Sequence, residues 1–321
     1  MSKYSDESLM PFTDYGSVMR RKFGGRVQKL AIDAGFTCPN RDGKVGVGGC
    51  SFCAMESFSP SYCREARDLY EQLDLAVEFH ATRRRLADYY FAYLQAGSNT
   101  YANVNTLHCI YSAILRYPDV SGIIIGTRPD CVDSEKLQML EELSSNGYVA
   151  VEYGIESVDD ATLRHVGRGH DFAVARWAVA ETRKRKIDVG AHFIIGLPNR
   201  TKEQTLAAVS DINSLGINYI KFHQLQVHAS TRLAEEYRLH PERFMLRGKN
   251  ALEEYVELMV EVVRRLDPRI AIDRFASSSP LRDVIHSPLG GVSVADVRRM
   301  IGNRLTALGA RQGDLFSPDT K

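Results

Sequence analysis

Three of the six cysteines, Cys38, Cys50 and Cys53, lie in one short segment that is rich in residues that interrupt helices and strands. Five glycines or prolines stand between Cys38 and Cys50, so the segment is expected to form a loop. Such a loop can fold its thiolates around an inorganic centre and direct free backbone N–H groups to the sulfurs. Structural zinc and electron-transfer clusters prefer four protein ligands, whereas a four-iron cluster on three thiolates keeps one iron open. The spacing therefore indicates a metal centre that can bind a further molecule.

The other cysteines leave alternatives open. Structural zinc with Cys63 or a histidine as fourth ligand is compatible with the spacing, and so is a loop of unliganded thiols. Cys109 falls in an expected helix and is predicted to be a core residue. Cys131 follows a strand end and is predicted to be structural. Cys63 is the only one close enough in sequence to serve as a spare ligand.

Segments of strand composition alternate with segments of helical periodicity, as βα units require. The expected strands are 27–34, 89–95, 122–127, 149–155, 189–196 and 219–227. The expected helices are 69–86, 104–116, 134–144, 172–186 and 201–215. Most of these strands are apolar on both faces, as in a parallel sheet covered by helices. Six such units suit a partial barrel with its active site at the C-terminal ends of the strands, and a doubly wound open sheet is the alternative.

The last part of the chain has a different pattern. An amphipathic helix is expected over 251–266, a short strand over 270–275, a loop at 277–280 and a helix over 294–308. We therefore expect an N-terminal extension over 1–24, a core barrel over 25–235 and a small C-terminal subdomain over 236–321.

Composition excludes several classes of protein. With 321 residues, 44% hydrophobic content and 25% charged content, the chain can bury a large core and is not expected to be disordered. It has no apolar run of the roughly 20 residues that a membrane span needs. Residues 1–14 are polar and acidic and do not resemble an export signal, so a cytoplasmic location is expected. The net charge of +1 gives no dominant nucleic-acid footprint, although it allows a local basic patch.

Taken together, the sequence resembles the radical SAM superfamily. The wide first cysteine spacing is similar to that of the group that contains the catalytic subunit of Elongator and its small bacterial relatives, the YhcC-like proteins. Five further motifs carry the resemblance, in the expected order: QAGSNTY at 95–101, TRPD at 127–130, EYGIES at 152–157, GRGH at 167–170 and FIIGLP at 193–198. The resemblance covers about residues 25–235 and includes no acetyltransferase domain.

The resemblance implies a fold and a set of site residues. The fold is an α/β partial (βα)6 TIM-like barrel of the radical SAM type, with a small α+β C-terminal extension that caps it. Cys38, Cys50 and Cys53 would ligate a [4Fe-4S] cluster, with S-adenosylmethionine (SAM) on the fourth iron. The other cofactor-binding residues that it implies are Gln95, Gly97, Ser98, Asn99, Arg128, Glu156, Ser157, Arg168 and Gly196. Among these, Gln95 to Asn99 would lie beside the SAM amino group, Glu156 on the ribose hydroxyls and Arg168 on the carboxylate.

The implied activity is reductive cleavage of SAM to a 5′-deoxyadenosyl radical. A low-potential donor such as a flavodoxin or ferredoxin would supply the electron. The Elongator-like motifs favour a nucleic-acid substrate, for example tRNA, while a metabolite or a protein stays open. Two alternatives come from other classes: a zinc- or iron–sulfur-stabilised binding protein that never cleaves SAM, and a metabolite-processing α/β barrel in which the cysteines are incidental.

Overall fold

The computed structural model describes residues 10–55, 59–83, 86–277 and 283–318. These residues form two compact units. One unit runs from Met19 to His192, and the other joins the N-terminal segment up to Val18 to the region from Phe193 onward. The cysteine loop and the QAGSNTY, TRPD, EYGIES and GRGH motifs therefore all belong to the first unit.

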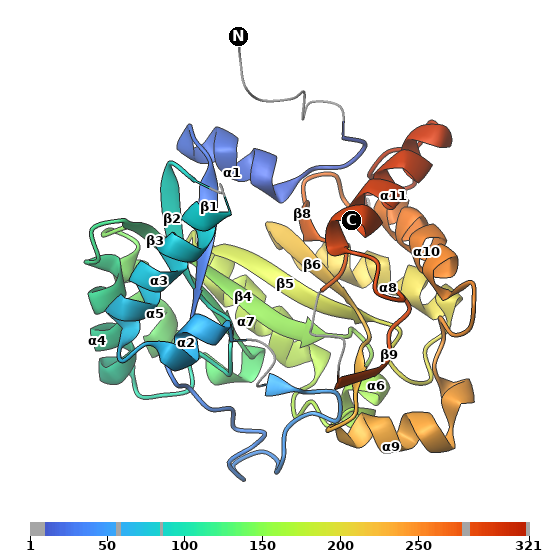
Figure 1. Cartoon of the computed structure of the whole chain (residues 1–321), viewed down its shortest axis with the longest axis horizontal. Helices are drawn as coiled ribbons and strands as arrows, with labels where there is room; N and C mark the ends of the chain where they lie inside the picture. Colours follow the sequence, from blue (N-terminus) through green and yellow to red (C-terminus); the bar gives the residue numbers. More distant parts are fainter. Residues whose placement is uncertain (1–9, 56–58, 84–85, 278–282, 319–321) are drawn as a thin grey trace. The chain divides into compact units, whose positions relative to one another are not determined.

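Helices and strands alternate along most of the chain (Figure 1). The strands are β1 (Val27–Ile32), β2 (Tyr89–Leu94), β3 (Val120–Thr127), β4 (Tyr148–Glu156), β5 (Asp188–Ile195), β6 (Tyr219–Gln224), β7 (Val227–His228), β8 (Ala271–Arg274) and β9 (Val284–His286). The α-helices are α1 (Tyr15–Phe23), α2 (Ser61–Glu65), α3 (Leu69–Thr82), α4 (Val104–Leu115), α5 (Ser134–Leu143), α6 (Asp160–His165), α7 (Phe172–Lys184), α8 (Lys202–Ser214), α9 (Arg232–Leu239), α10 (Ala251–Arg265) and α11 (Val294–Ala307). Two short 3₁₀ helices, Pro129–Cys131 and Pro241–Arg243, complete the set.

Side-chain oxygens cap most of the longer helices at their N-termini, as the residues before those helices favour. Aspartates Asp68, Asp133 and Asp171 accept backbone N–H bonds at the starts of α3, α5 and α7. Thr201 and Gln204 form a reciprocal capping box at the start of α8. Each cap satisfies N–H groups that have no partner within the helix.

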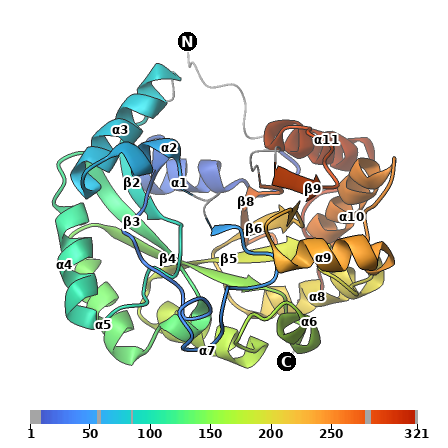
Figure 2. The same ribbon diagram turned by 60° about the horizontal axis from the view of Figure 1, so that its bottom comes forward.

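In the unit Met19–His192, strands β1 to β4 pair in chain order and run parallel. Helix α3 packs on β1, α4 on β3, and α5 and α7 on β4, and Figures 1 and 2 show α4 and α5 side by side. Alternation along β4 separates two faces of this strand. Tyr153 points to the helices, where its hydroxyl lies 2.7 Å from the hydroxyl of Thr182 on α7. Glu152, Gly154 and Glu156 alternate with it and belong to the other face.

That other face carries a buried charged cluster. Glu152 has a fully buried side chain, and its two carboxylate oxygens lie 3.1 Å from Nζ of Lys29 on β1 and 3.0 Å from Nε2 of His192 on β5. A carboxylate removed from water needs such partners, because an unpaired charge would cost several kcal/mol (about 3–5). Lys29 and His192 thus pair with the Glu152 carboxylate on the face opposite the helices.

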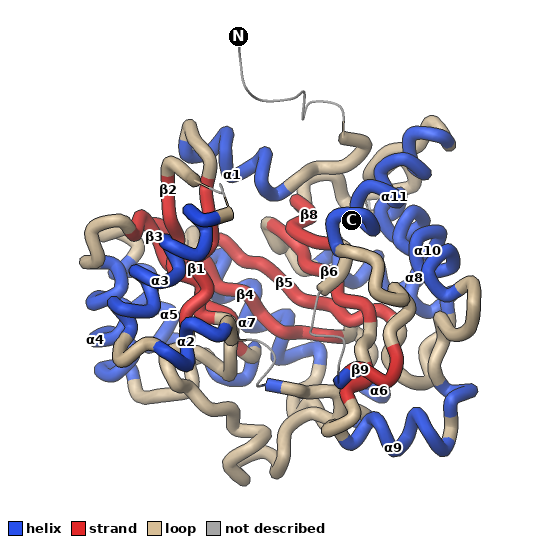
Figure 3. Tube along the Cα trace, viewed as in Figure 1, coloured by secondary structure: helices blue, strands red, loops and turns tan. Residues whose placement is uncertain are grey.

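The strands form one seven-stranded sheet in the order β1-β2-β3-β4-β5-β6-β8, coloured red in Figure 3. Chain order along a parallel sheet, with helices between the strands, is the arrangement of a partial (βα) barrel. The predicted fold class is therefore confirmed. The doubly wound alternative is wrong, because no strand of this sheet reverses the order.

In the second unit, β6 and β8 pair in parallel, and β7 and β9 form a separate antiparallel pair. Helix α10 packs against both α8 and α11. The expected strand over 270–275 appears as β8 and extends the main sheet as its seventh strand. Of the expected loop at 277–280, only Ser277 falls within the described residues, and the predicted end of the helix over 69–86 lies partly outside them.

Three sequence-based expectations need correction. Cys109 is exposed and is not a core residue, because the buried positions of α4 are Leu107, Tyr111 and Ile114, on the opposite side of the helix. The strand expected over 219–227 is divided into β6 and β7. Helices α1, α2, α6 and α9 have no counterpart among the expected helices, because each is short and α1 and α9 are rich in charged residues.

Candidate active site

The cysteine loop leaves the end of β1 and folds back on itself through backbone hydrogen bonds. The N–H of Arg41 donates to the carbonyl of Cys38 (2.8 Å), and the N–H of Val45 donates to that of Pro39 (2.8 Å). Gly48 and Gly49 then adopt positive φ angles of 78° and 88° directly before Cys50. Glycine takes this conformation without steric cost, so the pair can turn the chain back toward Cys38.

The returning part of the loop is attached to the segment after α6. The N–H of Ser51 donates to the carbonyl of Val166 (2.9 Å). The amide of Asn40 donates to the carbonyl of Gly167 (2.5 Å) and also lies 3.2 Å from Sγ of Cys50. The GRGH motif and the cysteine loop, 114 or more residues apart in sequence, are therefore joined directly.

Each of the three cysteines faces the guanidinium of a different arginine. Nη1 of Arg128 lies 3.9 Å from Sγ of Cys38, and Nη1 of Arg168 lies 3.5 Å from Sγ of Cys50. Nη1 of Arg41 lies 3.9 Å from Sγ of Cys53. N–H groups directed at thiolates stabilise their negative charge, whether or not a metal is bound. The three guanidiniums thus favour the ionised form of the three cysteines in this loop.

Burial works against ionisation of the free thiols. Burial and the neighbouring Cys50 raise the pKa of Cys53 to about 11, against the lowering effect of Arg41 and Arg168. Cys38 also acts on Cys53, so all three sulfurs lie within electrostatic reach of one another. A bound cationic centre would supply the charge that makes all three thiols ionise. The arrangement therefore fits a metal centre better than three free thiols.

Within the described ranges, no group of three or more His, Cys, Asp or Glu side chains is placed to hold a single metal ion. A four-iron cluster takes each cysteine at a different iron, so its ligands need not converge on one point. Three sulfurs as ligands, each with a guanidinium nearby to stabilise its negative charge, fit such a cluster.

Arg128 and Arg168 are each tied to a carboxylate. Arg128 has a fork-shaped pair of bonds to Asp130, with Nε 2.9 Å from Oδ1 and Nη2 2.7 Å from Oδ2. Nη2 of Arg168 donates to the carbonyl of Gly154 and lies 3.6 Å from Oε1 of Glu156. Nε of Arg168 is buried and has no hydrogen-bond partner among the described residues. A buried donor without a protein acceptor is a feature that needs an explanation, such as a bound ligand or water.

Glu156 ends β4 with a φ of 72°, a conformation that is unfavourable for a side chain other than glycine. Burial raises the pKa of this carboxyl, and Arg168 and Arg128 act in the opposite direction. Such backbone strain is retained at functional sites, where the surrounding structure enforces it. Ser157, the next residue, is buried, and its hydroxyl accepts the N–H of Asp159 (3.0 Å) at the start of α6.

The QAGSNTY segment follows β2 and lies directly against the start of the cysteine loop. The N–H of Ser98 donates to the carbonyl of Thr37 (3.0 Å), one residue before Cys38. A Cβ on Gly97 would overlap the carbonyl oxygen of Phe36. The amide of Asn99 donates to the carbonyl of Gly126 (2.7 Å), which fixes this segment to β3, and Gln95 is half-buried before it.

The structure thus gathers most of the predicted site residues in the unit Met19–His192. Gly196 lies in the other unit, where it follows β5 with a φ of 96°. Cys63 donates to the carbonyl of Ala31 (3.7 Å) and Cys131 is buried in the 3₁₀ helix Pro129–Cys131. Burial raises the pKa of Cys131 to about 12.

Sequence reasoning missed Asn40, Arg41 and His170. His170 is buried, its Nδ1 lies 3.2 Å from the carbonyl oxygen of Asp171, and its Nε2 has no hydrogen-bond partner in the described structure. Burial and the nearby Arg168 together lower its pKa to about 4. The signal for all three was present, since each lies inside a motif that was used only for a neighbouring residue.

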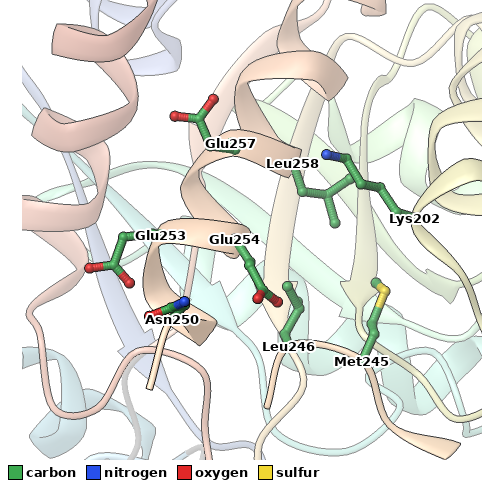
Figure 4. A pocket seen from close by; sticks show the side chains of 8 residues that line it. All are labelled: Lys202, Met245, Leu246, Asn250, Glu253, Glu254, Glu257 and Leu258. Atoms are coloured by element: carbon green, nitrogen blue, oxygen red, sulfur yellow. The ribbon is translucent and has the colours of Figure 1, made fainter. Parts of the chain in front are cut away.

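A pocket of about 550 Å³ lies in the second unit, beside α8 and α10 (Figure 4). Its lining residues are Lys202, Met245, Leu246, Asn250, Glu253, Glu254, Glu257 and Leu258. Glu257 is paired with Arg304 at 2.7 Å. The pocket contains no cysteine, histidine or other group of the predicted site, so the cysteine loop is the stronger candidate.

Comparison with known proteins decides between the classes left open. The model of the radical SAM superfamily matches residues 38–212, which is more than half of the chain. This chain belongs to the radical SAM superfamily. A model of the radical SAM C-terminal domain matches residues 217–305.

Individual relatives place the chain within the superfamily. Protein YhcC of Escherichia coli strain K12 is 34% identical over 276 residues, which are 86% of each chain. Elongator complex protein 3 of Schizosaccharomyces pombe is 28% identical over 202 residues, 60% of this chain and 34% of that one. The structure of archaeal Elp3 from Methanocaldococcus infernus has a TM-score of 0.66 at 16% identity, covering 89% of this chain and 64% of that one. The chain is a radical SAM enzyme of the YhcC-like group, which is related to Elongator.

Members of this superfamily generally bind a [4Fe-4S] cluster and SAM and need a reductant. The alternatives of a binding protein and of an unrelated α/β barrel are therefore wrong. Among the described residues, no helix is long and apolar enough to cross a membrane.

Proposed function

We propose that this chain cleaves SAM reductively at a [4Fe-4S] cluster held by Cys38, Cys50 and Cys53. The observation that supports this most directly is the placement of three cysteines of one loop, each facing its own guanidinium. When bound, the reduced cluster would supply one electron to the sulfonium of SAM. Breakage of a C–S bond would then give methionine and a 5′-deoxyadenosyl radical.

The chain's own residues would bind and orient the cofactor. Arg168 would direct its free Nε toward the SAM carboxylate while Glu156 and Gly154 hold its Nη2 in place. Glu156 would accept hydrogen bonds from the ribose hydroxyls at the end of β4. Ser98, Asn99 and Gly97 would form the wall beside the methionyl amine, because their segment is bonded to Thr37 and Gly126. Gln95, Arg128, Ser157 and Gly196 complete the proposed set.

The central test is anaerobic reconstitution with iron and sulfide, followed by dithionite and SAM and chromatography for 5′-deoxyadenosine. Wild-type protein is expected to form it, and Cys50→Ala is expected to lose both the cluster spectrum and the product. Cys109→Ala is the matched control, because Cys109 is an exposed thiol on α4. Product that persists in Cys50→Ala, or wild-type protein that holds zinc and forms no product, would contradict the proposal.

The substrate class is a separate proposal. The motifs shared with Elongator favour a nucleic acid, and we propose tRNA as the first substrate to test. The test is incubation of the reconstituted enzyme with unfractionated tRNA and mass spectrometry of the digested nucleosides. A new or lost modified nucleoside would support the proposal, whereas an unchanged profile with intact 5′-deoxyadenosine formation would direct the search to metabolites and proteins. A cytoplasmic location and the boundaries at 24/25 and 235/236 stay predictions.

A further inference from the structure

The part of the cysteine loop between the first two ligands forms a hairpin, residues 42–47, that is built rigidly and exposed. Asp42 and Val47 pair as an antiparallel bridge, and the N–H of Gly43 donates to the carbonyl of Gly46 (3.1 Å). The Asp42 carboxylate accepts the N–H of Lys44 (3.2 Å). The hairpin therefore presents its side chains in a defined arrangement.

Two apolar side chains of this hairpin face solvent. Val47 is 78% exposed and Val45 is 47% exposed, and Val47 is the most exposed large apolar side chain in the described part of the chain. Val45 also has its Cγ1 beside Gly169 of the GRGH motif. Val47 is therefore the main apolar group that this hairpin presents to a partner.

Cations accompany the apolar pair. Lys44 is exposed, with Nζ 5.3 Å from the centre of the Tyr101 ring. Arg41 precedes the hairpin, and Arg164 is exposed in the last turn of α6, two residues before Val166, to which the cysteine loop is bonded. Asp42 is the single acidic residue of the hairpin. Residues 41–47 thus carry two cations and one carboxylate, on a chain whose net charge is only +1.

The hairpin is also connected closely to the sulfurs. It lies between Cys38 and Cys50 in the chain, and Nη1 of Arg41, the residue just before it, lies 3.9 Å from Sγ of Cys53. A protein that docks on the hairpin would thus bring its redox centre close to the proposed cluster. Electron-transfer encounters are small and transient, and charge steers them more than area does.

We propose that this hairpin, with Lys44, Val45 and Val47, is the docking surface for an acidic, low-potential electron-carrier protein. The inference rests on the proposed function, because only a redox cluster needs such a partner. Charge complementarity favours an acidic protein, and the valines favour a protein surface over RNA, since a phosphate backbone offers nothing apolar for them to cover.

The test compares two reductants on the reconstituted full-length protein. The variant Lys44→Glu/Val47→Glu reverses the charge and removes the exposed apolar group. The control variant Leu239→Glu/Lys249→Glu makes the same change in charge and type at two exposed positions of the second unit. The measured quantity is the rate at which the cluster absorbance bleaches with reduced flavodoxin or with dithionite.

With flavodoxin, bleaching of the hairpin variant is expected to be about tenfold slower than that of wild type and control, and less sensitive to salt. With dithionite, a small reductant that needs no docking, all three proteins are expected to bleach equally. An equal loss with both reductants would overturn the proposal, because the hairpin would then belong to the cluster housing. An unchanged bleaching rate with flavodoxin would overturn it as well. A hairpin variant that is reduced normally by flavodoxin but no longer binds tRNA would also overturn it.

Failure of the proposed function has a separate signature. It would appear as absence of 5′-deoxyadenosine with dithionite in wild type, whatever the dependence of bleaching on flavodoxin. A reductant-selective defect without product would leave the docking surface standing and remove SAM cleavage.

Discussion

At the scale of single residues, the three arginines differ in whether a carboxylate compensates their positive charge. Asp130 pairs with Arg128, and Glu156 lies 3.6 Å from Arg168. Arg41 forms no ion pair in the part of the chain that the structure describes, so its positive charge acts on Cys53 without compensation. A cation beside a cluster stabilises the more negative reduced form, and hydrogen bonds to cluster sulfurs raise the potential.

We therefore expect Arg41→Gln to lower the midpoint potential of the reconstituted cluster by on the order of 50 mV. A potentiometric titration followed by electron paramagnetic resonance measures it. Arg238→Gln, an exposed substitution on α9, is the control and is expected to leave the potential unchanged. A shift to higher potential in Arg41→Gln would contradict this assignment of charge.

His170 makes a second prediction at this scale. Burial, with Arg168 and Arg128, holds its pKa at about 4, below the ordinary value of 6.5. Between these pH values the unfolded chain binds a proton at His170 that the folded chain does not. The contribution of His170 to the free energy of unfolding is therefore complete above about pH 6.5 and is lost as the pH falls toward 4. Urea unfolding of the cluster-free protein at pH 7.5, 6 and 5 should show this loss, and His170→Gln should reduce the slope. An identical slope in both proteins would show that His170 does not cause it.

At the scale of elements, the turn after β2 decides whether the SAM segment can lie against the cysteine loop. Gly97 has a φ of 77°, and a Cβ there would meet the carbonyl oxygen of Phe36. The close approach allows the N–H of Ser98 to reach Thr37. The contact between the turn after β2 and the start of the cysteine loop therefore requires glycine at position 97.

We expect Gly97→Ala to lower the free energy of unfolding by about 3 kcal/mol, from backbone strain and overlap together. Gly43→Ala is the matched control, because Gly43 has a φ of 92° but open space around the added Cβ. Its cost should be about 1 kcal/mol, the strain alone. Equal costs in urea denaturation would indicate that the contact with Phe36 relaxes freely.

At the scale of the whole molecule, all three proposed cluster ligands and the arginines that face them lie in the unit Met19–His192. A group that binds only the folded state stabilises the part that holds it. Reconstitution is expected to raise the melting temperature by about 5–10 °C. Hydrogen exchange should slow in the cysteine loop and in residues 95–99 and 167–170, with no comparable change in α10 and α11. Equal protection of both units would contradict a cluster bound by the first unit alone.

The alternation of strands and helices along the chain and the cysteine loop could be predicted from sequence, because both depend on neighbours along the chain. Periodicity reports which face of a segment is buried, and glycine-rich spacing reports a loop. Short helices such as α6 and α9 were not predicted, because tertiary packing and not local preference stabilises them.

The partners of the sulfurs were decided only when the chain folded. Arg41, Arg128 and Arg168 belong to three segments, and nothing local to any of them specifies which cysteine it faces. Strand β8 shows the same limit, since its sequence identifies a strand but not the sheet edge that it joins. Cys109 shows it for burial, because half a turn of a helix separates a core position from an exposed one. Contacts between distant segments depend on strand register and loop path, which are properties of the packed molecule and not of any one segment.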